Sequence, residues 1–358
     1  MEVGFLTERM LPGLGVDRLV YEYSKNLKKF ENNSFIHASI TDPDLVPENV
    51  KIKTLPPIRS RKPPVQDIWA IENMPSLSAK KEIKWILSTP PYFALSPLLH
   101  DSTILHGGTT PHQGLNLKGK AVYYWREITQ NMLYYPCATR IVSLSHFLTN
   151  GLPKTLQDKS EIINPGWNHY PKKNDQNTAA LKDKLGRKHA ATILYMGRLN
   201  AQYQPYKGLL NLIKMTKEMS SVKLICSGYG DQNDVANLEN LGVQVFQNHP
   251  SDEMGDLIGA VDFVVMGSEW EGYGLPAAEA QYQGTPVIAL NRGALSEVVE
   301  NNKTGFLVDN FKEMKTQINR LLRNKDLYQE VSEAGIERSQ NFTWEKSTRQ
   351  LESFLKSR

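Results

Sequence analysis

Short apolar runs alternate along the chain with longer stretches in which apolar residues recur every three or four positions. Residues 1–7 form the first run, and Val16, Leu19, Val20 and Tyr23 then repeat with the period of a helix. The same alternation of a predicted strand with a predicted helix continues through the rest of the chain. It is typical of parallel sheets covered by helices, so the pattern predicts an α/β protein.

The predicted strands fall into two series. The first series includes short buried strands at residues 104–105 and 139–144. The proline-rich residues 42–67 predict a loop. The aromatic residues 121–135 predict a helix that packs in the core, and the wall of an acceptor groove is the less favoured alternative. The second series is more regular and lies at residues 191–196, 222–226, 243–246, 261–266 and 286–289.

Length and composition limit the class of protein. The chain has 358 residues, which fits two α/β domains better than one. We expect them at residues 1–168 and 169–340, since the polar run 172–178 is typical of a link. Hydrophobic residues make up 40% and charged residues 22%, as in soluble globular proteins. Cys137 and Cys226 form neither a disulfide framework nor a metal-binding pattern, which predicts a reducing compartment.

The excess positive charge lies in the first half of the chain. Lys and Arg outnumber Asp and Glu by 19 to 15 over residues 1–168 and equal them at 23 to 23 over residues 169–358, for a net charge of +4. A solvated surface explains this excess, and a docking face for anionic lipid or a phosphate-bearing acceptor is the alternative. The sequence predicts no nucleic-acid arm, signal peptide or membrane span. The basic clusters are Lys25/Lys28/Lys29, Arg59/Arg61/Lys62 and Lys80/Lys81/Lys84.

The most specific pattern is residues 268–279, in which Glu271 and Glu279 enclose two glycines and a proline. Gly272 and Gly274 allow a tight turn, and the N–H groups at the start of the following helix favour an anion such as phosphate. Carboxylates do not bind phosphate, but they accept hydrogen bonds from hydroxyl groups. With Glu271 in the loop and Glu279 in the first helical turn, the pattern predicts a nucleotide-sugar site.

Two basic residues suit the same ligand. Arg198 follows the predicted strand 191–196, and Lys207 precedes the next predicted helix. Ligands of open α/β sheets bind beyond the carboxyl ends of strands, so both charges could meet a diphosphate. Gly228 follows the predicted strand 222–226 and could let a base or ribose lie close to the backbone. An ordinary tight turn explains this glycine equally well.

The first half of the chain contains weaker candidates. His106 ends a predicted strand and precedes two glycines, where it could bond to the transferred sugar or its acceptor, or simply satisfy a turn. His112 is a second, weaker candidate. Gly13 and Gly15 lie in the first strand-to-helix loop and could approach the diphosphate from the opposite domain. A Gly-x-Gly pattern also occurs in plain turns, so it is weak evidence alone.

Together these motifs resemble the retaining glycosyltransferases of family 4, also called glycosyl transferases group 1. The resemblance runs from residue 1 to about residue 345 and implies the GT-B fold, in which two Rossmann-like, doubly wound parallel sheets face a cleft. It also implies that a C-terminal helix at residues 341–358 returns to the first domain. The matching segments are 197–199, 207–208, 268–280, 284–289, 297–299, 304–308 and 342–345.

The resemblance implies a role for each matching residue. Glu271 would hold hydroxyl groups of the donor sugar and Glu279 those of the ribose, while Arg198 and Lys207 would neutralise the diphosphate. His106 would lie near the transferred sugar. The other donor-binding positions would be Gly15, Gly228, Gly272, Tyr273, Gly274 and Leu275.

Two departures from the family pattern affect these roles. Nine positions separate Arg198 from Lys207, which is wider than is common. Either the loop bulges and Lys207 still reaches the diphosphate, or Tyr203 or Tyr206 has joined the donor site. Residues 164–166 invert the usual order of proline and asparagine, so no role is carried over to the asparagine.

The expected activity is transfer of a hexose-type sugar from a nucleoside-diphosphate sugar to a glycan, lipid-linked or small-molecule acceptor, with retention at the anomeric carbon. Cell-surface polysaccharide or glycolipid synthesis would use such an activity. Two fixed cations would stabilise the departing diphosphate without a metal or another cofactor. The expected location is the cytoplasm or the inner face of a membrane. The alternatives are a sugar-nucleotide epimerase on the same fold, which would need no acceptor, and a non-catalytic nucleotide-sugar-binding subunit.

Overall fold

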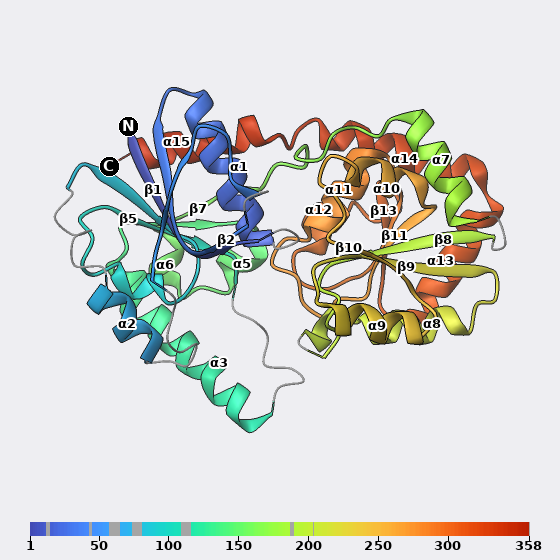
Figure 1. Cartoon of the computed structure of the whole chain (residues 1–358), viewed down its shortest axis with the longest axis horizontal. Helices are drawn as coiled ribbons and strands as arrows, with labels where there is room; N and C mark the ends of the chain where they lie inside the picture. The colour runs from blue at the N-terminus through green and yellow to red at the C-terminus, as the bar shows by residue number, and fades with distance from the viewer. Residues whose placement is uncertain are drawn as a thin grey trace. The chain divides into compact units, whose positions relative to one another are not determined.

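The computed structural model describes residues 1–11, 15–42, 45–56, 65–73, 81–108, 116–186, 190–202 and 204–357. The chain divides into two compact units, and each is an α/β domain (Figure 1). The first unit comprises Met1–Pro165 and Trp344–Arg358, and the second comprises Gly166–Thr343. Some residues singled out in the sequence lie outside the described ranges, namely Gly13, Arg59, Arg61, Lys62, Lys80, His112 and Tyr203.

The first unit contains a seven-stranded parallel sheet with the strand order β3-β2-β1-β4-β5-β6-β7. The strands are β1 (Glu2–Met10), β2 (Asn33–Thr41), β3 (Lys51–Thr54), β4 (Ile83–Leu87), β5 (Ser102–His106), β6 (Arg140–Ser143) and β7 (Ser160–Ile162). The α-helices are α1 (Gly15–Lys29), α2 (Val65–Asn73), α3 (Leu117–Thr129), α4 (Tyr135–Cys137), α5 (His146–Asn150), α6 (Lys154–Gln157) and α15 (Trp344–Lys356). The described residues of this unit also form a 3-10 helix, η3 (Tyr92–Leu95), and a π-helix, η4 (Gln130–Tyr134).

The second unit contains a six-stranded parallel sheet with the strand order β10-β9-β8-β11-β12-β13. The strands are β8 (Ala191–Met196), β9 (Val222–Gly228), β10 (Gln244–Gln247), β11 (Phe263–Met266), β12 (Val287–Leu290) and β13 (Gly305–Val308). The helices are α7 (Asp175–Leu185), α8 (Leu209–Lys217), α9 (Gln232–Asn240), α10 (Met254–Ala260), α11 (Leu275–Gln283), α12 (Leu295–Val298), α13 (Phe311–Arg323) and α14 (Lys325–Ser339). A 3-10 turn, η5 (Pro205–Lys207), precedes α8.

Both sheets are doubly wound. In the second unit the chain runs outward from β8 through β9 to β10, and then crosses to build β11, β12 and β13 on the other side of β8. The first unit repeats this plan around β1 and β4. Each sheet has its own core, with Trp85 and Tyr92 buried in the first and Phe263 and Phe306 buried in the second. The alternating pattern therefore predicted the fold class correctly, because strands covered on both faces need continuous apolar runs.

Three expectations from the sequence are wrong in detail. Residues 42–67 include the edge strand β3 and the start of α2, and β3 escaped notice because it is largely exposed and carries no apolar run. The polar run 172–178 lies within the second unit, where the amide of Asn174 donates to Asp256 Oδ1 over 2.6 Å. The helix predicted within residues 121–135 exists as α3, but its apolar side faces solvent rather than the core.

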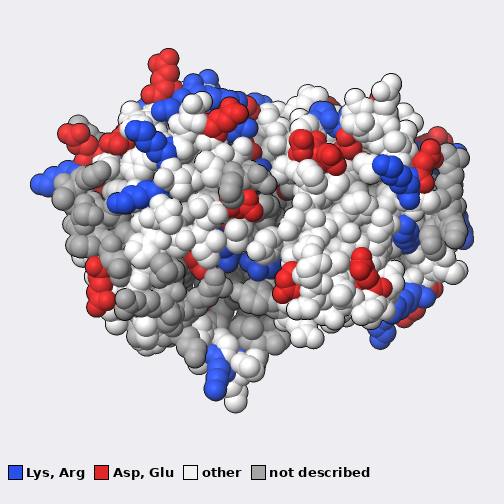
Figure 2. Space-filling view, in the orientation of Figure 1, with Lys and Arg blue, Asp and Glu red and all other residues white. Residues whose placement is uncertain are grey.

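Of the predicted basic clusters, the structure describes Lys25, Lys28 and Lys29 and, from the last cluster, Lys81 and Lys84. In the view of Figure 2, blue and red residues are interspersed over this unit. Lys28 and Lys29 occupy the last turn of α1, where the helix dipole favours cations. Lys84 is not part of an open patch, because its ammonium pairs with Asp101 over 2.7 Å. Across the described ranges, none of the helices is both long enough and apolar enough to span a bilayer.

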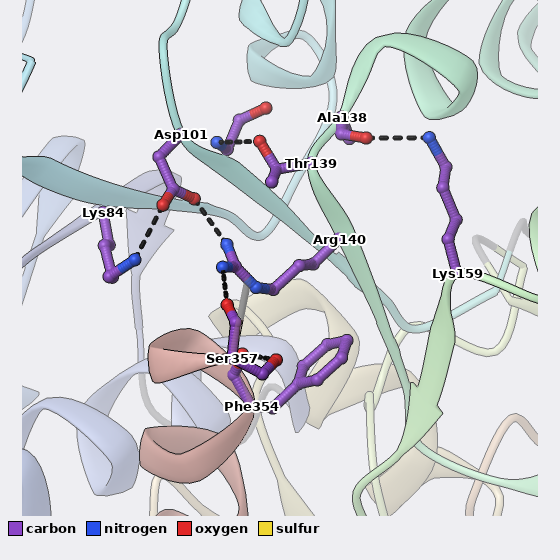
Figure 3. A network of polar contacts seen from close by, with 9 residues as sticks. Lys84, Asp101, Ala138, Thr139, Arg140, Lys159, Phe354 and Ser357 are labelled. Atoms are coloured by element: carbon purple, nitrogen blue, oxygen red, sulfur yellow. Dashed lines mark hydrogen bonds and ion pairs between the residues drawn. The ribbon is translucent and has the colours of Figure 1, made fainter.

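The C-terminal helix α15 is fastened within the first unit. Tyr23 of α1 packs edge-on against Trp344, with 5.3 Å between ring centroids, and its hydroxyl lies 2.9 Å from Ser347 Oγ. Figure 3 shows a second attachment, in which Arg140 of β6 bonds both to Asp101 Oδ1, over 2.7 Å, and to the main-chain carbonyl of Ser357. The end of the helix is thereby tied to the edge at which β5 and β6 begin.

Candidate functional site

The candidate residues of the second unit come together at one point of its sheet. β8 and β11 are adjacent strands from which the chain continues in opposite directions along the sheet, so they form the switch point of a doubly wound fold. Ligands of such folds bind beyond the carboxyl ends of the strands at this point. Arg198 follows β8 and Glu271 follows β11, so the two loops singled out in the sequence are neighbours.

The loop after β8 is held close to the end of β9. The hydroxyl of Tyr195 donates to the carbonyl of Arg198 over 3.2 Å, and the amide of Leu199 donates to the carbonyl of Tyr229 over 2.9 Å. A Cβ atom at Gly228 would lie 1.6 Å from the carbonyl oxygen of Gly197. Glycine at position 228 is therefore required for the two strand ends to pack together, which gives this residue a structural reason for being glycine.

The long segment between Arg198 and Lys207 folds so that Lys207 reaches the loop after β11. The turn η5 places Lys207 Nζ 2.8 Å from Glu271 Oε1. Tyr206 packs edge-on against Trp270, with 6.5 Å between ring centroids. Gly208 then starts α8 with a φ of 72°, and a Cβ atom there would lie 2.0 Å from a carbonyl oxygen of the β11 loop. The two loops are thus joined through both side chains and backbone.

The Lys207–Glu271 pair is mostly shielded from water. The side chain of Lys207 is 25% exposed and that of Glu271 is 7% exposed. Burial alone would lower the pKa of the Lys207 ammonium, but the charge of Glu271 and its hydrogen bond to the lysine more than offset it, so this pKa is raised above its ordinary value. Arg198 is close enough to oppose the rise. Lys207 therefore stays charged at neutral pH, beside a second cation.

The backbone of Glu271 is also fixed. The loop after β12 passes over it, where the amide of Ala294 donates to the carbonyl of Glu271 over 2.9 Å. Gly293 has a φ of 60°, and a Cβ atom there would lie 2.2 Å from the same carbonyl oxygen. Residues 293–294 were not singled out in the sequence, although the glycine is the kind of signal that marks such close contacts.

The start of α11 has the geometry expected of an anion-binding helix terminus. Gly274 is its N-cap with a φ of 104°, and the amides of Ala277 and Ala278 already bond to the carbonyl of Gly274. The amide of Leu275, the first helical residue, has no acceptor within the helix by construction. Because the helix begins at Leu275, Glu279 is its fifth residue and lies beyond the first turn, which corrects the expectation from the sequence.

Glu279 has a partner that the sequence did not reveal. His169 Nε2 lies 3.0 Å from Glu279 Oε1, and the histidine side chain is fully buried. A carboxylate only accepts hydrogen bonds, so the histidine is the donor and the second carboxylate oxygen keeps its lone pairs. Close by in the chain, Trp167 Nε1 donates to the hydroxyl of Tyr273 over 2.8 Å. The side chain of Tyr273 is thereby buried, which leaves its backbone as the part that could meet a donor.

The candidate residues of the first unit that the structure describes are His106 and Gly15. His106 ends β5 and is 8% exposed. Its Nδ1 lies 3.0 Å from the hydroxyl of Tyr135, and the backbone of Leu148 provides another hydrogen bond. Burial lowers the pKa of His106 to about 4, and the bond to Leu148 opposes this only in part. His106 is therefore neutral at pH 7. The other candidate of this unit, Gly15, is the first residue of α1 and is exposed.

The switch point of the second unit thus combines three kinds of group. Arg198 and Lys207 supply positive charge, and the start of α11 supplies a backbone donor with the positive end of a helix dipole. Glu271 and Glu279 supply carboxylate oxygens, one held by an ammonium and the other by an imidazole. This arrangement can bind a phosphate between two groups that accept hydrogen bonds from hydroxyls.

The sequence of this chain is similar to those of known proteins. Residues 177–356 match the family model described as Glycosyl transferases group 1. An uncharacterized glycosyltransferase of Methanocaldococcus jannaschii is 26% identical over 253 residues, 68% of this chain and 64% of that protein. A D-inositol 3-phosphate glycosyltransferase of Corynebacterium efficiens is 28% identical over 217 residues, 55% of this chain and 50% of that protein. The chain therefore spans between half and two thirds of the length of these curated relatives.

The fold has known counterparts as well. The Anabaena protein HepE, solved in complex with UDP and glucose, superimposes with a TM-score of 0.77 over 100% of both chains at 16% identity. Two doubly wound parallel sheets of seven and six strands are the architecture of the GT-B glycosyltransferases. With the family model covering half of the chain, this protein belongs to the glycosyl transferases group 1 and has the GT-B fold.

Proposed function

We propose that this protein transfers a hexose-type sugar from a nucleoside-diphosphate sugar to a glycan, lipid-linked or small-molecule acceptor, with retention at the anomeric carbon. The observation that carries the proposal is the convergence of Arg198, the Lys207–Glu271 pair and the start of α11 at the switch point of the second sheet. UDP bound to HepE makes a uridine nucleotide the first donor to test.

In the proposed complex, the diphosphate lies at the start of α11 and meets Arg198 and Lys207. The sugar hydroxyls bond to Glu271, and the ribose hydroxyls bond to the free oxygen of Glu279. The separation of the two glutamates by the Gly272–Leu275 turn supports this order, because it puts the anion-binding backbone between the two carboxylates. Gly228 would let the nucleoside lie close to the end of β9.

A same-face reaction is the proposed route to retention, because neither glutamate is disposed as the nucleophile that a covalent glycosyl-enzyme route would need. Glu271 is paired with an ammonium and Glu279 with an imidazole, and both contacts lower the reactivity of a carboxylate. As the bond between the anomeric carbon and the donor phosphate breaks, negative charge builds on the diphosphate, where Arg198 and Lys207 stabilise it. The acceptor oxygen then attacks the same face, and an oxygen of the departing phosphate takes its proton.

Two fixed cations can also neutralise a departing diphosphate without a divalent ion, so metal-independent transfer is part of the proposal. Comparing the initial rates of transfer with and without EDTA tests this part by itself. Unchanged rates are expected, and a loss of activity that Mg²⁺ restores would contradict it.

The central experiment combines donor binding with product analysis. UDP-glucose and other nucleotide sugars are first screened for an increase in melting temperature, because a ligand of the folded state raises stability. The stabilising donor is then incubated with candidate acceptors, and NMR of the product gives the anomeric configuration. A product with the donor's configuration is expected, and an inverted product would refute the retaining mechanism.

Matched variants test the residues. Glu271→Ala should abolish transfer, and Glu271→Gln, which preserves shape but not charge, should lose most of it while donor binding remains measurable. Full activity in either variant would contradict the assignment. Sugar release or epimerisation from the donor without any acceptor would favour the epimerase alternative. Donor binding with no turnover for any acceptor would favour the binding-subunit alternative.

A further inference from the structure

Helix α3 turns its apolar side to the solvent. The exposed apolar side chains of α3 lie four, seven, eight and eleven positions after the first, which places them on one helical face, and Met132 of the following π-helix η4 continues the series. The buried polar residues Thr129 and Gln130, where α3 ends and η4 begins, lie off this face. This is the reverse of a helix that packs on a sheet, where the apolar face is buried. The α3 apolar face comprises Leu117, Ala121, Tyr124, Trp125, Ile128 and Met132, and the two end residues are 86% and 71% exposed.

Polar contacts at the start of the helix and beyond its end hold it in this orientation. The side chain of Asn116 caps its start by accepting from the amide of Gly119 over 2.9 Å. Beyond its end, the hydroxyl of Tyr134 donates to Asp67 of α2 over 2.8 Å. Helices α2 and α3 are neighbours in Figure 1, and α2 also exposes apolar side chains. The α3 apolar face is therefore presented by a capped and anchored helix.

Basic residues flank the α3 apolar face. Lys118 and Lys120 are exposed, and at 100° per residue they lie on opposite sides of Leu117. Three basic residues, with Arg126, stand against the single acid Glu127 in this helix. In Figure 2, blue and white atoms lie over the end of α3 that projects furthest from the sheet.

We propose that the α3 apolar face docks on an anionic membrane surface, with the helix lying in the plane of the interface. Aliphatic and aromatic side chains would enter the boundary between headgroups and acyl chains, where Tyr and Trp are favoured, and Lys118 and Lys120 would meet lipid phosphates. The thirteen residues of α3 rise about 20 Å, too little to cross a hydrocarbon core of about 30 Å. The helix therefore lies on the membrane rather than spanning it.

A second copy of the chain fits this face less well. A stable protein interface takes roughly 20 to 30 residues from each partner, and the α3 apolar face has six. Pairing two such faces would also bring the flanking lysines of both copies together, which is unfavourable. A lipid surface needs no such area and supplies the opposite charge. This docking goes beyond the proposed transfer reaction and does not depend on it.

Sedimentation with vesicles tests the docking directly. The full chain is mixed with large vesicles of phosphatidylcholine alone and of phosphatidylcholine with 30% phosphatidylglycerol, and the bound fraction is measured at low and high salt. We expect binding to the anionic vesicles that weakens with salt. Trp125→Glu with Ile128→Glu should lower the apparent partition coefficient at least about tenfold, which corresponds to about 1.4 kcal/mol. Lys118→Glu with Lys120→Glu should weaken binding to anionic vesicles only.

Leu210→Glu is the matched control, because Leu210 is an exposed apolar residue, 50% accessible, on α8 of the second unit. Its binding should equal that of the wild type, and circular dichroism verifies folding of every variant. No binding of the wild type to anionic vesicles would overturn the proposal, as would binding that the α3 substitutions leave unchanged. A dimer in solution that Trp125→Glu with Ile128→Glu dissociates would also overturn it, in favour of self-association.

Discussion

His106 should remain neutral well below the pH at which histidines usually become charged. Its imidazole is 8% exposed, and burial lowers its pKa from an ordinary value near 6.5 to about 4. The unfolded chain therefore binds a proton at a pH where the folded chain does not, so folding stability falls as the pH drops through this range. Replacing the histidine with glutamine, which can still bond to Tyr135 but does not titrate, should remove this dependence.

The magnitude follows from the two pKa values. A difference between 6.5 and about 4 is worth about 3 kcal/mol when fully expressed, since one pKa unit corresponds to about 1.4 kcal/mol. Linkage gives a loss of about 0.2 kcal/mol at pH 7 and about 2 kcal/mol at pH 5. Between these two pH values, the wild type should thus lose about 2 kcal/mol more than His106→Gln does.

Native-state hydrogen exchange of peptides covering β5 measures this difference as an opening free energy at pH 7 and pH 5. His100→Gln, which removes an exposed histidine, is the matched control and should behave as the wild type. Equal pH dependence in the wild type and His106→Gln would refute the reasoning, as would an NMR titration of His106 with a midpoint near its ordinary value. If the prediction holds, His106 can contribute a hydrogen bond to a substrate but no charge at neutral pH.

Three further substitutions test contacts of the structure. Lys207→Met leaves a buried carboxylate unpaired and, with a quarter of the lysine side chain exposed, should cost about 2 kcal/mol, or about 4–8 °C in melting temperature for a unit of this size. Adding Glu271→Gln should recover most of that loss, and additive losses in calorimetry would count against the pairing. His169→Phe should raise the donor KM about tenfold with little change in kcat, because it loosens Glu279 at a cost of about 1.4 kcal/mol. His169→Gln should restore the KM, and an unchanged KM in the Phe variant would rule out a positioning role. Arg140→Met should release the end of α15 and speed hydrogen exchange of peptides 344–356, with a stability loss of about 2 kcal/mol. Unchanged exchange there would show that the attachment in Figure 3 is dispensable.

The sequence was most informative where backbone geometry restricts residue type. β8 was predicted at residues 191–196 and occupies those residues, because a strand buried on both faces must be apolar throughout. Gly274 was recognisable because a positive φ at a helix start favours glycine. The pairing of His169 with Glu279 was not readable, since it joins residues 110 positions apart through one hydrogen bond. Helical periodicity located α3 but could not tell whether its apolar face met the core or the solvent.

The Lys207–Glu271 contact constrains how the proposed donor can be held. While the two groups are paired, Lys207 has less charge to offer a phosphate, and Glu271 Oε1 is already accepting a hydrogen bond. A diphosphate at the start of α11 competes for the same ammonium. If Lys207 moves toward the diphosphate, the Glu271 carboxylate loses its hydrogen-bond donor and needs another. Sugar hydroxyls are the donors that would then be nearest. Phosphate binding and sugar binding should therefore be coupled. A nucleoside diphosphate without its sugar should have a higher Kd than the intact donor, because it lacks the sugar's contacts and also leaves Glu271 without a hydrogen-bond donor when Lys207 moves to the phosphate.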